Sequence, residues 1–347
     1  MVETAEYETV IVGGGPAGAA AAWELTRHGH DCVVLDRESF PREKLCAGWI
    51  TPQVLEDLEF QPEDYPHRFL TFDALQINLG RLHVPFHSPQ HSIRRFEFDR
   101  WLVERSGAPL IQHRVREVTV DARSLVIDGR FRCRNLIGAG GTRCPVERRF
   151  FRSVRARCKS LQVVTQELEF PCTAVGRDCH LWFFHDGLPG YAWYVPKAEG
   201  YVNVGVGGMA AKLTARRDSI RNQWQLLVAR LRDLELLPAD PGEPGGYSYY
   251  LRERTFTADR LQRDCATLRE GDTALSARPG RVFLTGDAAG LATRDMCEGI
   301  GPAVRSGLLA ARAILQDGAV DPAGIDPHTL GRPLVARGLD LAFTRNH

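Results

Sequence analysis

The chain has 347 residues, of which 44% are hydrophobic and 25% are charged, and its formal net charge is +1. This length allows two domains, or one large α/β unit, with a substantial buried core. The near-zero charge excludes any strong electrostatic case for nucleic acid as the main partner. No apolar run approaches the roughly 20 residues of a membrane-spanning helix. We therefore expect no transmembrane segment, and peripheral membrane contact stays open.

The nine cysteines are scattered, with no CxxC pair and no Cys/His spacing typical of a zinc site. We therefore expect neither a bound metal nor a disulfide framework. The first apolar stretch follows acidic residues and leads directly into a glycine cluster, which is unlike a signal peptide. Reduced thiols and a cytoplasmic location are the corresponding expectations.

The first elements predict a βαβ unit. Residues 10–12 are β-branched, as in a strand buried on both faces. Residues 16–28 form an alanine-rich helical segment that Gly29 ends, and residues 32–35 form a second buried strand. Residues 53–92 are mixed, rich in proline, and are expected to cross between layers.

The later elements alternate between helical and strand-like patterns. Short aromatic runs between residues 160 and 207 predict an antiparallel sheet. After them we expect a helix over 214–236, a Pro/Gly-rich connection over 238–246, a buried strand over 281–284 and a helix over 301–315. The other expected elements are a helix over 97–106 and strands over 115–120, 124–127, 136–138, 161–167, 181–184, 191–195 and 201–206.

The turn after the first strand carries the nucleotide-binding pattern G-x-G-x-x-G at Gly13, Gly15 and Gly18. The first glycine permits the tight turn, the second lets the backbone approach a pyrophosphate, and the third lets the helix pack on the sheet. Asp36 ends the second strand and can accept both hydroxyls of a ribose. Pro16, Ala17 and Arg37 are the remaining residues of this segment that we expect to contact the cofactor.

A second motif near the other end of the chain favours FAD over NAD as the cofactor. Gly286 and Asp287 follow a predicted strand, where a carboxylate suits the ribityl hydroxyls of a flavin. The helix beginning near Gly299 and Ile300 would direct its N–H groups at the negative charge of a reduced flavin.

Further segments resemble geranylgeranyl reductases. Residues 39–48 (Ser-Phe-Pro-Arg-Glu-Lys-Leu-Cys-Ala-Gly) are similar to the loop that follows the second strand in that family. Residues 95–102 resemble its Arg-x-x-Phe-Asp-x-x-Leu helix, and residues 191–196 resemble its Tyr-x-Trp-x-Phe-Pro substrate-chamber motif. Residues 286–290 with 298–300 resemble its flavin-ring segment. The resemblance covers most of residues 8–316.

The resemblance implies an α/β chain, α+β overall, with the para-hydroxybenzoate hydroxylase-like fold, a superfamily that also contains flavin halogenases. A Rossmann-like FAD-binding layer would combine residues 1–75, 95–150 and 275–320. A discontinuous antiparallel-sheet substrate domain would combine 76–94 and 151–274, and 321–347 would form a C-terminal tail. Departures from the family pattern occur at 138–141 and 294–297, and little chain follows the final expected helix.

The resemblance also assigns candidate site residues. Cys46, Tyr191 and Trp193 are the catalytic candidates, and Cys46 would lie close to the flavin as a weak donor, a small packing residue or a redox thiol. The aromatic pair would line a substrate chamber or belong to ordinary sheet core. Cys297 is expected at the flavin as well, on the other side from Cys46. The further cofactor-binding candidates are Lys44, Ala47, Gly48, Arg95 and Gly140.

Two of these candidates have alternative interpretations. Lys44 is more simply a solvated loop charge. Arg95 could reach flavin or a carboxylate, or could be a surface charge at a helix start.

The function that we expect is hydride transfer between flavin N5 and a carbon–carbon bond of an apolar, prenyl-like substrate. The alternatives are a flavin-dependent monooxygenase or halogenase, for which only Lys44 is a plausible lysine, and a non-catalytic electron-transfer flavoprotein. The electron donor could be NADPH, ferredoxin or another flavoprotein.

Overall fold

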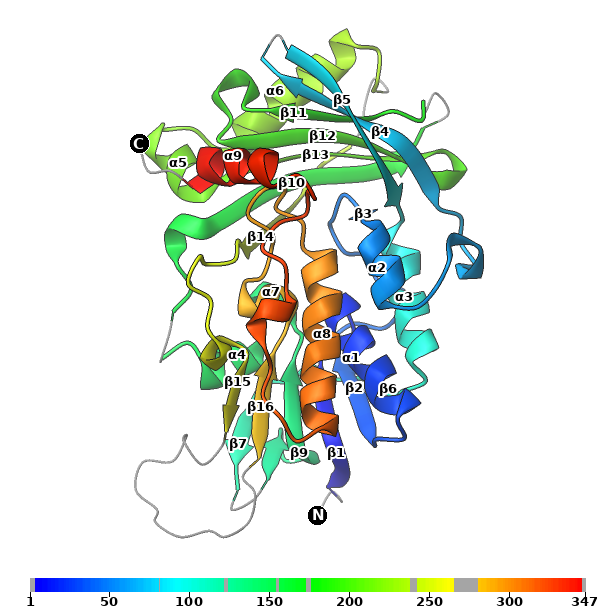
Figure 1. The fold of residues 1–347 in the computed structure, drawn as a ribbon, viewed down its shortest axis with the longest axis vertical. Helices are drawn as coiled ribbons and strands as arrows, with labels where there is room; N and C mark the ends of the chain where they lie inside the picture. The colour runs from blue at the N-terminus through cyan, green and yellow to red at the C-terminus, as the bar shows by residue number, and fades with distance from the viewer. Residues whose placement is uncertain are drawn as a thin grey trace.

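The computed structural model describes residues 4–80, 82–121, 124–153, 156–172, 176–237, 242–264 and 280–344. Two sheets lie one above the other, and long helices stand beside the lower sheet (Figure 1). No helix in these ranges is both long and apolar enough to cross a membrane.

The lower sheet is the nucleotide-binding layer, with strand order β15-β16-β9-β1-β2-β6 and β7-β8 joined to β9. The pairs within β16-β9-β1-β2-β6 are parallel, and the apolar side chains at their centre are fully buried. Its strands are β1 (Ala5–Val12), β2 (Cys32–Asp36), β6 (Leu110–Gln112), β7 (Val118–Val120), β8 (Leu125–Ile127), β9 (Phe131–Gly138), β15 (Gln262–Asp264) and β16 (Arg281–Leu284).

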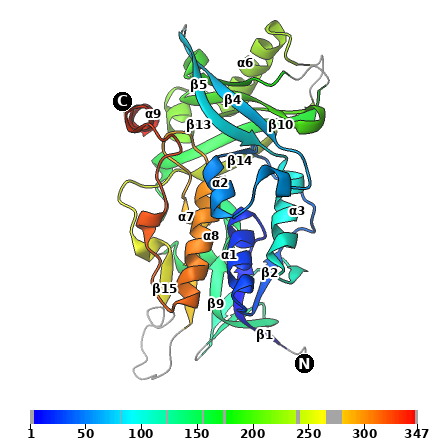
Figure 2. The ribbon, with the colours of Figure 1, turned by 45° about the vertical axis from the view of Figure 1, so that its right-hand side comes forward.

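Two helices from opposite ends of the chain pack side by side on this layer (Figure 2). A β-carbon at Gly307 of α8 would lie 2.2 Å from the carbonyl oxygen of Ala17 in α1, so only glycine permits this approach. The helices of this half are α1 (Pro16–Arg27), α2 (Pro52–Asp57), α3 (Arg95–Ser106), α4 (Pro145–Phe150), α7 (Gly286–Ala289) and α8 (Ile300–Leu315).

The upper sheet has the order β14-β10-β13-β12-β11-β4-β5-β3, and all its pairs are antiparallel except β11 with β4. The chain enters this sheet twice, once before α3 and once after α4. Its strands are β3 (Trp49–Ile50), β4 (Leu70–Leu79), β5 (Leu82–Ser92), β10 (Gln162–Pro171), β11 (Cys179–Phe183), β12 (Gly190–Lys197), β13 (Tyr201–Met209) and β14 (Gly245–Tyr250).

Helices cover both faces of the upper sheet. On the outer face, Trp224, Leu227 and Leu231 of α6 join the core that β12 and β13 build. On the inner face, Phe343 of α9 joins a core with Trp193. The three helices associated with this half are α5 (Ala210–Ala215), α6 (Ile220–Asp233) and α9 (Pro333–Thr344).

The expected layers and the βαβ start are confirmed, the single helix expected over 214–236 is wrong, and two other segments contain more regular structure than expected. The helix over 214–236 is two helices, because the chain turns between them at Arg217, where φ is 55°. Residues 53–92 form α2 and the β4–β5 hairpin. The segment after α8 contains α9, which packs on the upper sheet. Part of the expected Pro/Gly connection, 238–241, lies outside the described residues.

The proposed domain division stays a prediction. The boundary placed between residues 75 and 76 falls within β4, all of which belongs to the upper sheet.

Candidate cofactor and substrate site

The glycine turn after β1 is shaped by close backbone approaches. Gly13 has φ +112°, and a β-carbon there would lie 2.4 Å from the carbonyl oxygen of Ala139, next to Gly140. A β-carbon at Gly18 would lie 1.9 Å from the carbonyl oxygen of Gly13. Gly15 is different, because a β-carbon there would meet only Arg42 Nη2, at 3.5 Å. The space above Gly15 is therefore open and bordered by a guanidinium, which suits a pyrophosphate.

Asp36 lies at the end of β2 and is buried. Its Oδ2 accepts a hydrogen bond of 2.7 Å from the amide of Gly14, so the carboxylate is tied to the glycine turn. Arg42 Nε lies 3.8 Å from the same oxygen. Arg37, in contrast, is exposed and pairs with Glu38 at 3.2 Å, so its side chain lies away from this cluster. Arg42 was missed, although it stands in the loop that carries the family resemblance.

Asp287 connects the nucleotide layer with the upper sheet. Tyr247 of β14 donates a 3.0 Å hydrogen bond from its hydroxyl to Asp287 Oδ2. A β-carbon at Gly299 would lie 3.5 Å from Asp287 Oδ1, so the start of α8 is next to the same carboxylate. The amide of Gly286 donates to Ser306 Oγ of α8 at 2.9 Å. The starts of α7 and α8 therefore meet at one place, as the second motif predicts.

Arg157 holds this meeting point together, although no sequence motif marks it. Its guanidinium donates to the carbonyl oxygens of Asp287 at 3.2 Å and Thr142 at 2.7 Å. It also lies 4.7 Å from the centre of the Tyr250 ring. A single cation thus connects α7, the turn after β9 and the upper sheet.

The loop at 46–48 is fixed by the upper sheet. Lys197 Nζ donates to the carbonyl oxygen of Ala47 at 2.6 Å, and Asn203 Nδ2 donates to that of Cys46 at 3.3 Å. Gly48 has φ +64°, and a β-carbon there would lie 2.1 Å from the carbonyl oxygen of Ile93. Glycine is therefore required where this loop passes β5.

Lys44 is not the solvated loop charge that the sequence suggested. Its Nζ lies 3.2 Å from the centre of the Tyr247 ring and donates to the carbonyl oxygen of Leu45. Burial lowers the pKa of Lys44, and the nearby charge of Arg95 lowers it further. The loop therefore folds this ammonium group into the interior.

Arg95 is likewise not a surface charge. It is buried, and its Nε and Nη2 donate to the two oxygens of Asp99 at 2.6 and 2.8 Å. Burial disfavours its charge, but Asp99 and Cys46 outweigh that effect and raise the pKa of Arg95. The expected carboxylate partner exists and is Asp99.

Tyr191 and Trp193 of β12 both line a narrow pocket, with a free volume of only about 10 Å³, on the inner face of the upper sheet. The Tyr191 hydroxyl donates to the carbonyl oxygen of Met296 at 2.6 Å, and Trp193 Nε1 donates to Asn203 Oδ1 at 2.7 Å. Both rings also belong to the apolar core, so the same side chains form the pocket wall and part of the core. The pocket is lined by Val163, Pro189, Gly190, Tyr191, Trp193, Gly207, Gly208, Met209, Tyr249, Cys297 and Phe343.

Cys297 lines this pocket, whereas Cys46 lies in the loop below the sheet. Both side chains are close enough to Tyr191 to contribute to the raised pKa of its hydroxyl, of which burial is the main cause. Burial also raises the pKa of the Cys297 thiol, which favours the neutral form. Their placement at a flavin stays a prediction.

Comparison with known proteins agrees with this geometry. Residues 8–81 match the FAD dependent oxidoreductase family model. The chain is 29% identical to a menaquinone reductase of Mycobacterium tuberculosis, over 88% of the chain and 76% of that protein. It is 30% identical to digeranylgeranylglycerophospholipid reductase 1 of Methanopyrus kandleri, over 58% of each chain. The chain is an FAD-dependent oxidoreductase.

The fold of this oxidoreductase is that of its solved relatives. A geranylgeranyl bacteriochlorophyll reductase-like protein of Thermoplasma acidophilum superposes with a TM-score of 0.72 at 16% identity, over 93% of this chain and 82% of that one. The flavin-dependent halogenase CmlS superposes with a TM-score of 0.64 at 20% identity, over 91% and 59%. The resemblance to geranylgeranyl reductases and the para-hydroxybenzoate hydroxylase-like fold are confirmed.

FAD fits the residues of the oxidoreductase. The open space above Gly15, with Arg42 at its border, suits the pyrophosphate. The buried carboxylate of Asp36 suits a ribose, and Asp287 beside Gly299 suits a ribityl chain next to a helix start.

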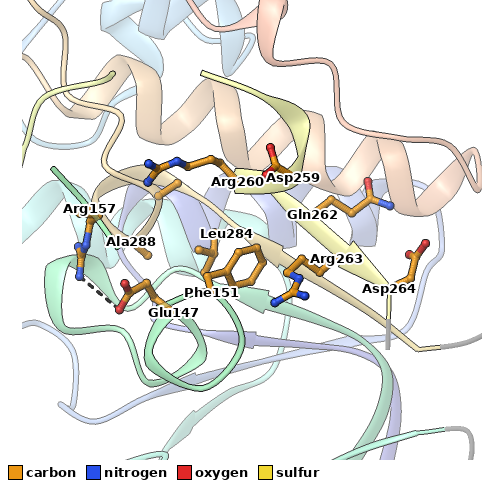
Figure 3. Close-up of a pocket in the computed structure, with 11 residues that line it drawn as sticks. Glu147, Phe151, Arg157, Asp259, Arg260, Gln262, Arg263, Asp264, Leu284 and Ala288 are labelled. Carbon is orange, nitrogen blue, oxygen red and sulfur yellow. Dashed lines mark ion pairs between the residues drawn. The ribbon is translucent and has the colours of Figure 1, made fainter. Parts of the chain in front are cut away.

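A second, larger pocket of about 390 Å³ lies beside α4, α7 and the β15–β16 pair (Figure 3). Figure 3 shows Arg157 pointing to Glu147, and the two charged groups are 3.3 Å apart. Arg260, which also lines the pocket, pairs with Glu253 at 2.6 Å. The pocket ends at Asp264, next to residues that the structure does not describe, and we assign no ligand to it. Its lining residues are Glu147, Phe151, Arg157, Asp259, Arg260, Gln262, Arg263, Asp264, Leu284, Ala288 and Ala289.

Proposed function

We propose that this oxidoreductase moves a hydride between flavin N5 and a carbon–carbon bond of an apolar, prenyl-like substrate. The observation that carries the proposal is the cluster of mainly apolar side chains, among them Tyr191, Trp193 and Phe343, that lines a narrow crevice on the inner face of the upper sheet. An apolar pocket with few polar groups suits a hydrocarbon chain. The names of two relatives, which refer to digeranylgeranylglycerophospholipid and menaquinone, support the same substrate class because both molecules carry prenyl chains.

The residues of the chain would have separate tasks in this reaction. Bound FAD would supply the hydride chemistry. Trp193 and Tyr191 would form the chamber wall and exclude water, and Cys46 would lie at its floor. The proposed cofactor contacts are Gly13, Gly15, Pro16, Ala17, Gly18, Asp36, Arg37, Lys44, Cys46, Ala47, Gly48, Arg95, Gly140, Gly286, Asp287, Gly299 and Ile300.

Two of these contacts have less support than the others. Arg37 pairs with Glu38 at the surface, and Arg95 is committed to Asp99. Arg42 is the stronger candidate for the cofactor cation, because Nη2 borders the space above Gly15.

An anaerobic single-turnover experiment tests the proposed reaction. Protein reduced with dithionite is freed of excess reductant and mixed with phospholipids or quinones that carry unsaturated prenyl chains. We expect flavin absorbance to return and the prenyl product to gain two hydrogens by mass spectrometry. Substrate-dependent oxygen consumption, with an oxygenated or halogenated product, would favour the oxygen-using alternatives. Return of the absorbance with protein electron acceptors alone would favour an electron carrier.

The electron donor and the location belong to the same proposal. We propose a cytoplasmic protein that receives electrons from NADPH, a ferredoxin or another flavoprotein. Anaerobic titration of the oxidised protein with NADPH separates these donors. Bleaching of the flavin by NADPH alone would exclude the need for a protein donor.

The outer face of α9 has the side chains expected for peripheral contact with a membrane. Leu334 is 85% exposed there, and Val335 and Leu341 are also exposed, next to the cation Arg337. The inner face of the same helix carries Phe343, which lines the pocket. An apolar helix face flanked by cations is typical of binding to anionic lipid surfaces.

Vesicle sedimentation tests this contact. Leu334→Asp is expected to weaken binding to anionic phospholipid vesicles. Leu234→Asp is the matched control, because Leu234 is 51% exposed at the end of α6. Equal binding of both variants and the wild type would remove α9 from the proposal.

A further inference from the structure

The pocket on the inner face of the upper sheet is closed in this structure. Its free volume is only about 10 Å³, which is room for about one water molecule. An apolar cavity that binds a molecule of benzene measures roughly 150 Å³. A hydrocarbon chain can therefore enter this pocket only if one of its walls moves.

Most of the pocket walls are fixed by hydrogen bonds. The strands β10, β12 and β13 are each paired with a neighbouring strand on both sides. The amide of Cys297 donates to the carbonyl oxygen of Thr293 at 3.1 Å, which fixes that wall as well. The Tyr191 hydroxyl ties β12 to the same loop through the carbonyl oxygen of Met296. Moving any of these walls would break bonds that an apolar ligand cannot replace.

Phe343 forms a wall of another kind, because α9 belongs to neither sheet. Its side chain is 1% exposed. The centre of its ring lies 5.4 Å from that of Phe184 and 6.4 Å from that of Tyr191. These contacts are apolar and carry no hydrogen bond, so another apolar group of similar size can replace the ring.

The chain just before α9 has a suitable hinge. The amides of Thr329 and Leu330 donate to the buried carboxylate of Asp295 at 2.8–3.0 Å, so the chain is fixed up to that point. A β-carbon at Gly331 would meet no atom within 4 Å, and α9 begins at Pro333. The helix can therefore turn about Gly331 while the preceding segment stays in place.

The second half of α9 is held closed by the buried carboxylate of Asp340. Its Oδ1 accepts from Arg294 Nε at 3.0 Å and lies 2.9 Å from Arg294 Nη2. Arg254 contacts the other oxygen at 3.3 Å from an exposed position, and Lys212 donates to the carbonyl oxygen of Ala342 at the surface. The buried pair of Asp340 and Arg294 thus joins α9 to the loop that precedes α8.

We propose that α9 is the movable wall of the pocket, and that a prenyl chain enters when α9 turns about Gly331 and takes the place of the Phe343 ring. The inference rests on the proposed function. Phe343 decides which molecules the pocket admits, and Asp340 is a positioning residue that favours the closed state through Arg294. Because the closed protein cannot bind the chain, the apparent affinity is reduced to the extent that open molecules are rare.

The first test measures binding of geraniol, a prenyl alcohol, to the FAD-loaded oxidised protein by calorimetry, so that no turnover is involved. Phe343→Ala is expected to bind geraniol about 10-fold more tightly than the wild type, because the ring no longer has to leave. The matched control is Leu341→Ala on the outer face of the same helix, where Leu341 is 40% exposed, and it is expected to bind like the wild type. Where Phe343→Ala does not fold, Phe343→Leu carries the test with a smaller gain.

The second test concerns Asp340, which does not line the pocket. Asp340→Asn is expected to tighten geraniol binding by up to about 10-fold, because it weakens the bond that holds α9 closed. Loss of a merely structural contact would weaken binding instead. Asp326→Asn is the control, because Asp326 accepts only an exposed hydrogen bond from the amide of His328 in the same C-terminal segment. It is expected to leave the affinity unchanged.

Hydrogen exchange measures the movement itself. When geraniol is added to the wild type, the amides of α9 are expected to exchange faster, while those of β12 exchange at the same rate or more slowly. A ligand that binds beside an unmoved α9 would slow exchange in both elements.

Two results would overturn the inference. One is slower exchange in α9 of the wild type when geraniol binds. The other is a folded Phe343→Ala that binds neither geraniol nor benzene more tightly than the wild type. A Phe343→Ala variant that binds benzene but no prenyl alcohol would support the role of the ring and would instead contradict the proposed substrate class.

Discussion

The two halves of the molecule build their sites from different parts of the chain. In the nucleotide-binding layer, Gly13, Gly15 and Gly18 would act through their backbone, and all lie within six consecutive residues. In the upper sheet, Tyr247 and Trp193 would act through side chains on strands that are not adjacent. A site made of backbone is visible in a short motif, whereas a site made of side chains becomes visible only when the strand order is known.

The largest expected effect concerns the glycine motif of the nucleotide-binding layer. Gly15→Val is expected to abolish FAD binding and leave the fold intact, because its side chain would enter open space meant for the pyrophosphate. Gly18→Val is expected to lose both FAD binding and the stable fold, because its β-carbon would collide with the carbonyl oxygen of Gly13. Absorbance and melting temperature measure the two outcomes.

The control for this pair is Gly318→Val, because a β-carbon there would meet no atom within 4 Å. The wild type is expected to carry one non-covalent FAD per chain. A wild-type protein that is colourless and takes up no added FAD, or a Gly15→Val variant that stays yellow, would contradict the assignment of the glycine motif.

A smaller effect is expected from truncation of a side chain in the upper sheet. Trp193→Ala is expected to lower the free energy of unfolding by about 3–5 kcal/mol, because it empties a core site. FAD per folded molecule should stay near the wild type while catalytic efficiency falls. Trp193→Phe keeps one aromatic ring but loses the indole atoms that pack on Gly205 and Gly207 and the bond to Asn203, so its cost is expected to lie between that of Trp193→Ala and zero. If Trp193→Ala loses bound FAD in parallel with a fall in melting temperature, Trp193 is an ordinary core residue rather than part of the chamber wall.

A pH-dependent effect is expected at Glu298, where the halves meet. Burial raises the pKa of Glu298 to about 7, from an ordinary value of 4.5. The folded state therefore holds the proton more tightly, and this stabilisation is fully present below pH 4.5 and is lost as the pH rises through about 7. The melting temperature of Glu298→Gln, relative to that of the wild type, should increase between pH 5 and pH 8. A constant difference would indicate an ordinary pKa.

No change in the number of free thiols is expected from Cys46 and Cys297 when the flavin is reduced, which is the smallest effect predicted here. A redox dithiol of Cys46 and Cys297 would need their α-carbons within about 7 Å and suitably directed side chains. Burial raises the pKa of Cys297, which disfavours the reactive thiolate. The number of free thiols counted under denaturing conditions should be the same before and after dithionite treatment. An increase after reduction would establish a disulfide and a redox role.

The sequence was sufficient for the parts whose geometry is local. The βαβ unit and Asp287 follow from motifs in which each residue type is required by a neighbouring backbone. The β4–β5 hairpin was missed because Pro85 interrupts the pattern of β5 and the other partner of β4 is β11, about 100 residues later. α9 was missed because Leu334 and Leu341 face outward, which obscures the helical period of its buried face.

The sequence predicted the backbone motifs of the candidate site, but not which charged side chains are buried there or how they pair. Tyr247 reaches the site through the order of the strands in the upper sheet, and Arg157 reaches it from the loop between α4 and β10. Lys44 and Arg95 were both identified as candidate residues. The burial of their side chains could not be predicted, because one stands in a loop and the other at the start of a helix.

The pairing of α1 with α8 has a consequence for the nascent chain on the ribosome. α1 is made first, yet the surface that covers it, including Gly307, emerges almost 300 residues later. Until then the face of the glycine-motif helix that packs on α8 has no partner, and β4 also waits for β11. Contacts that are so distant along the chain make folding slow and expose the early half to chaperones and to aggregation. We expect a chain released after residue 264 to be protease-sensitive and unable to retain FAD, although it contains the complete glycine motif.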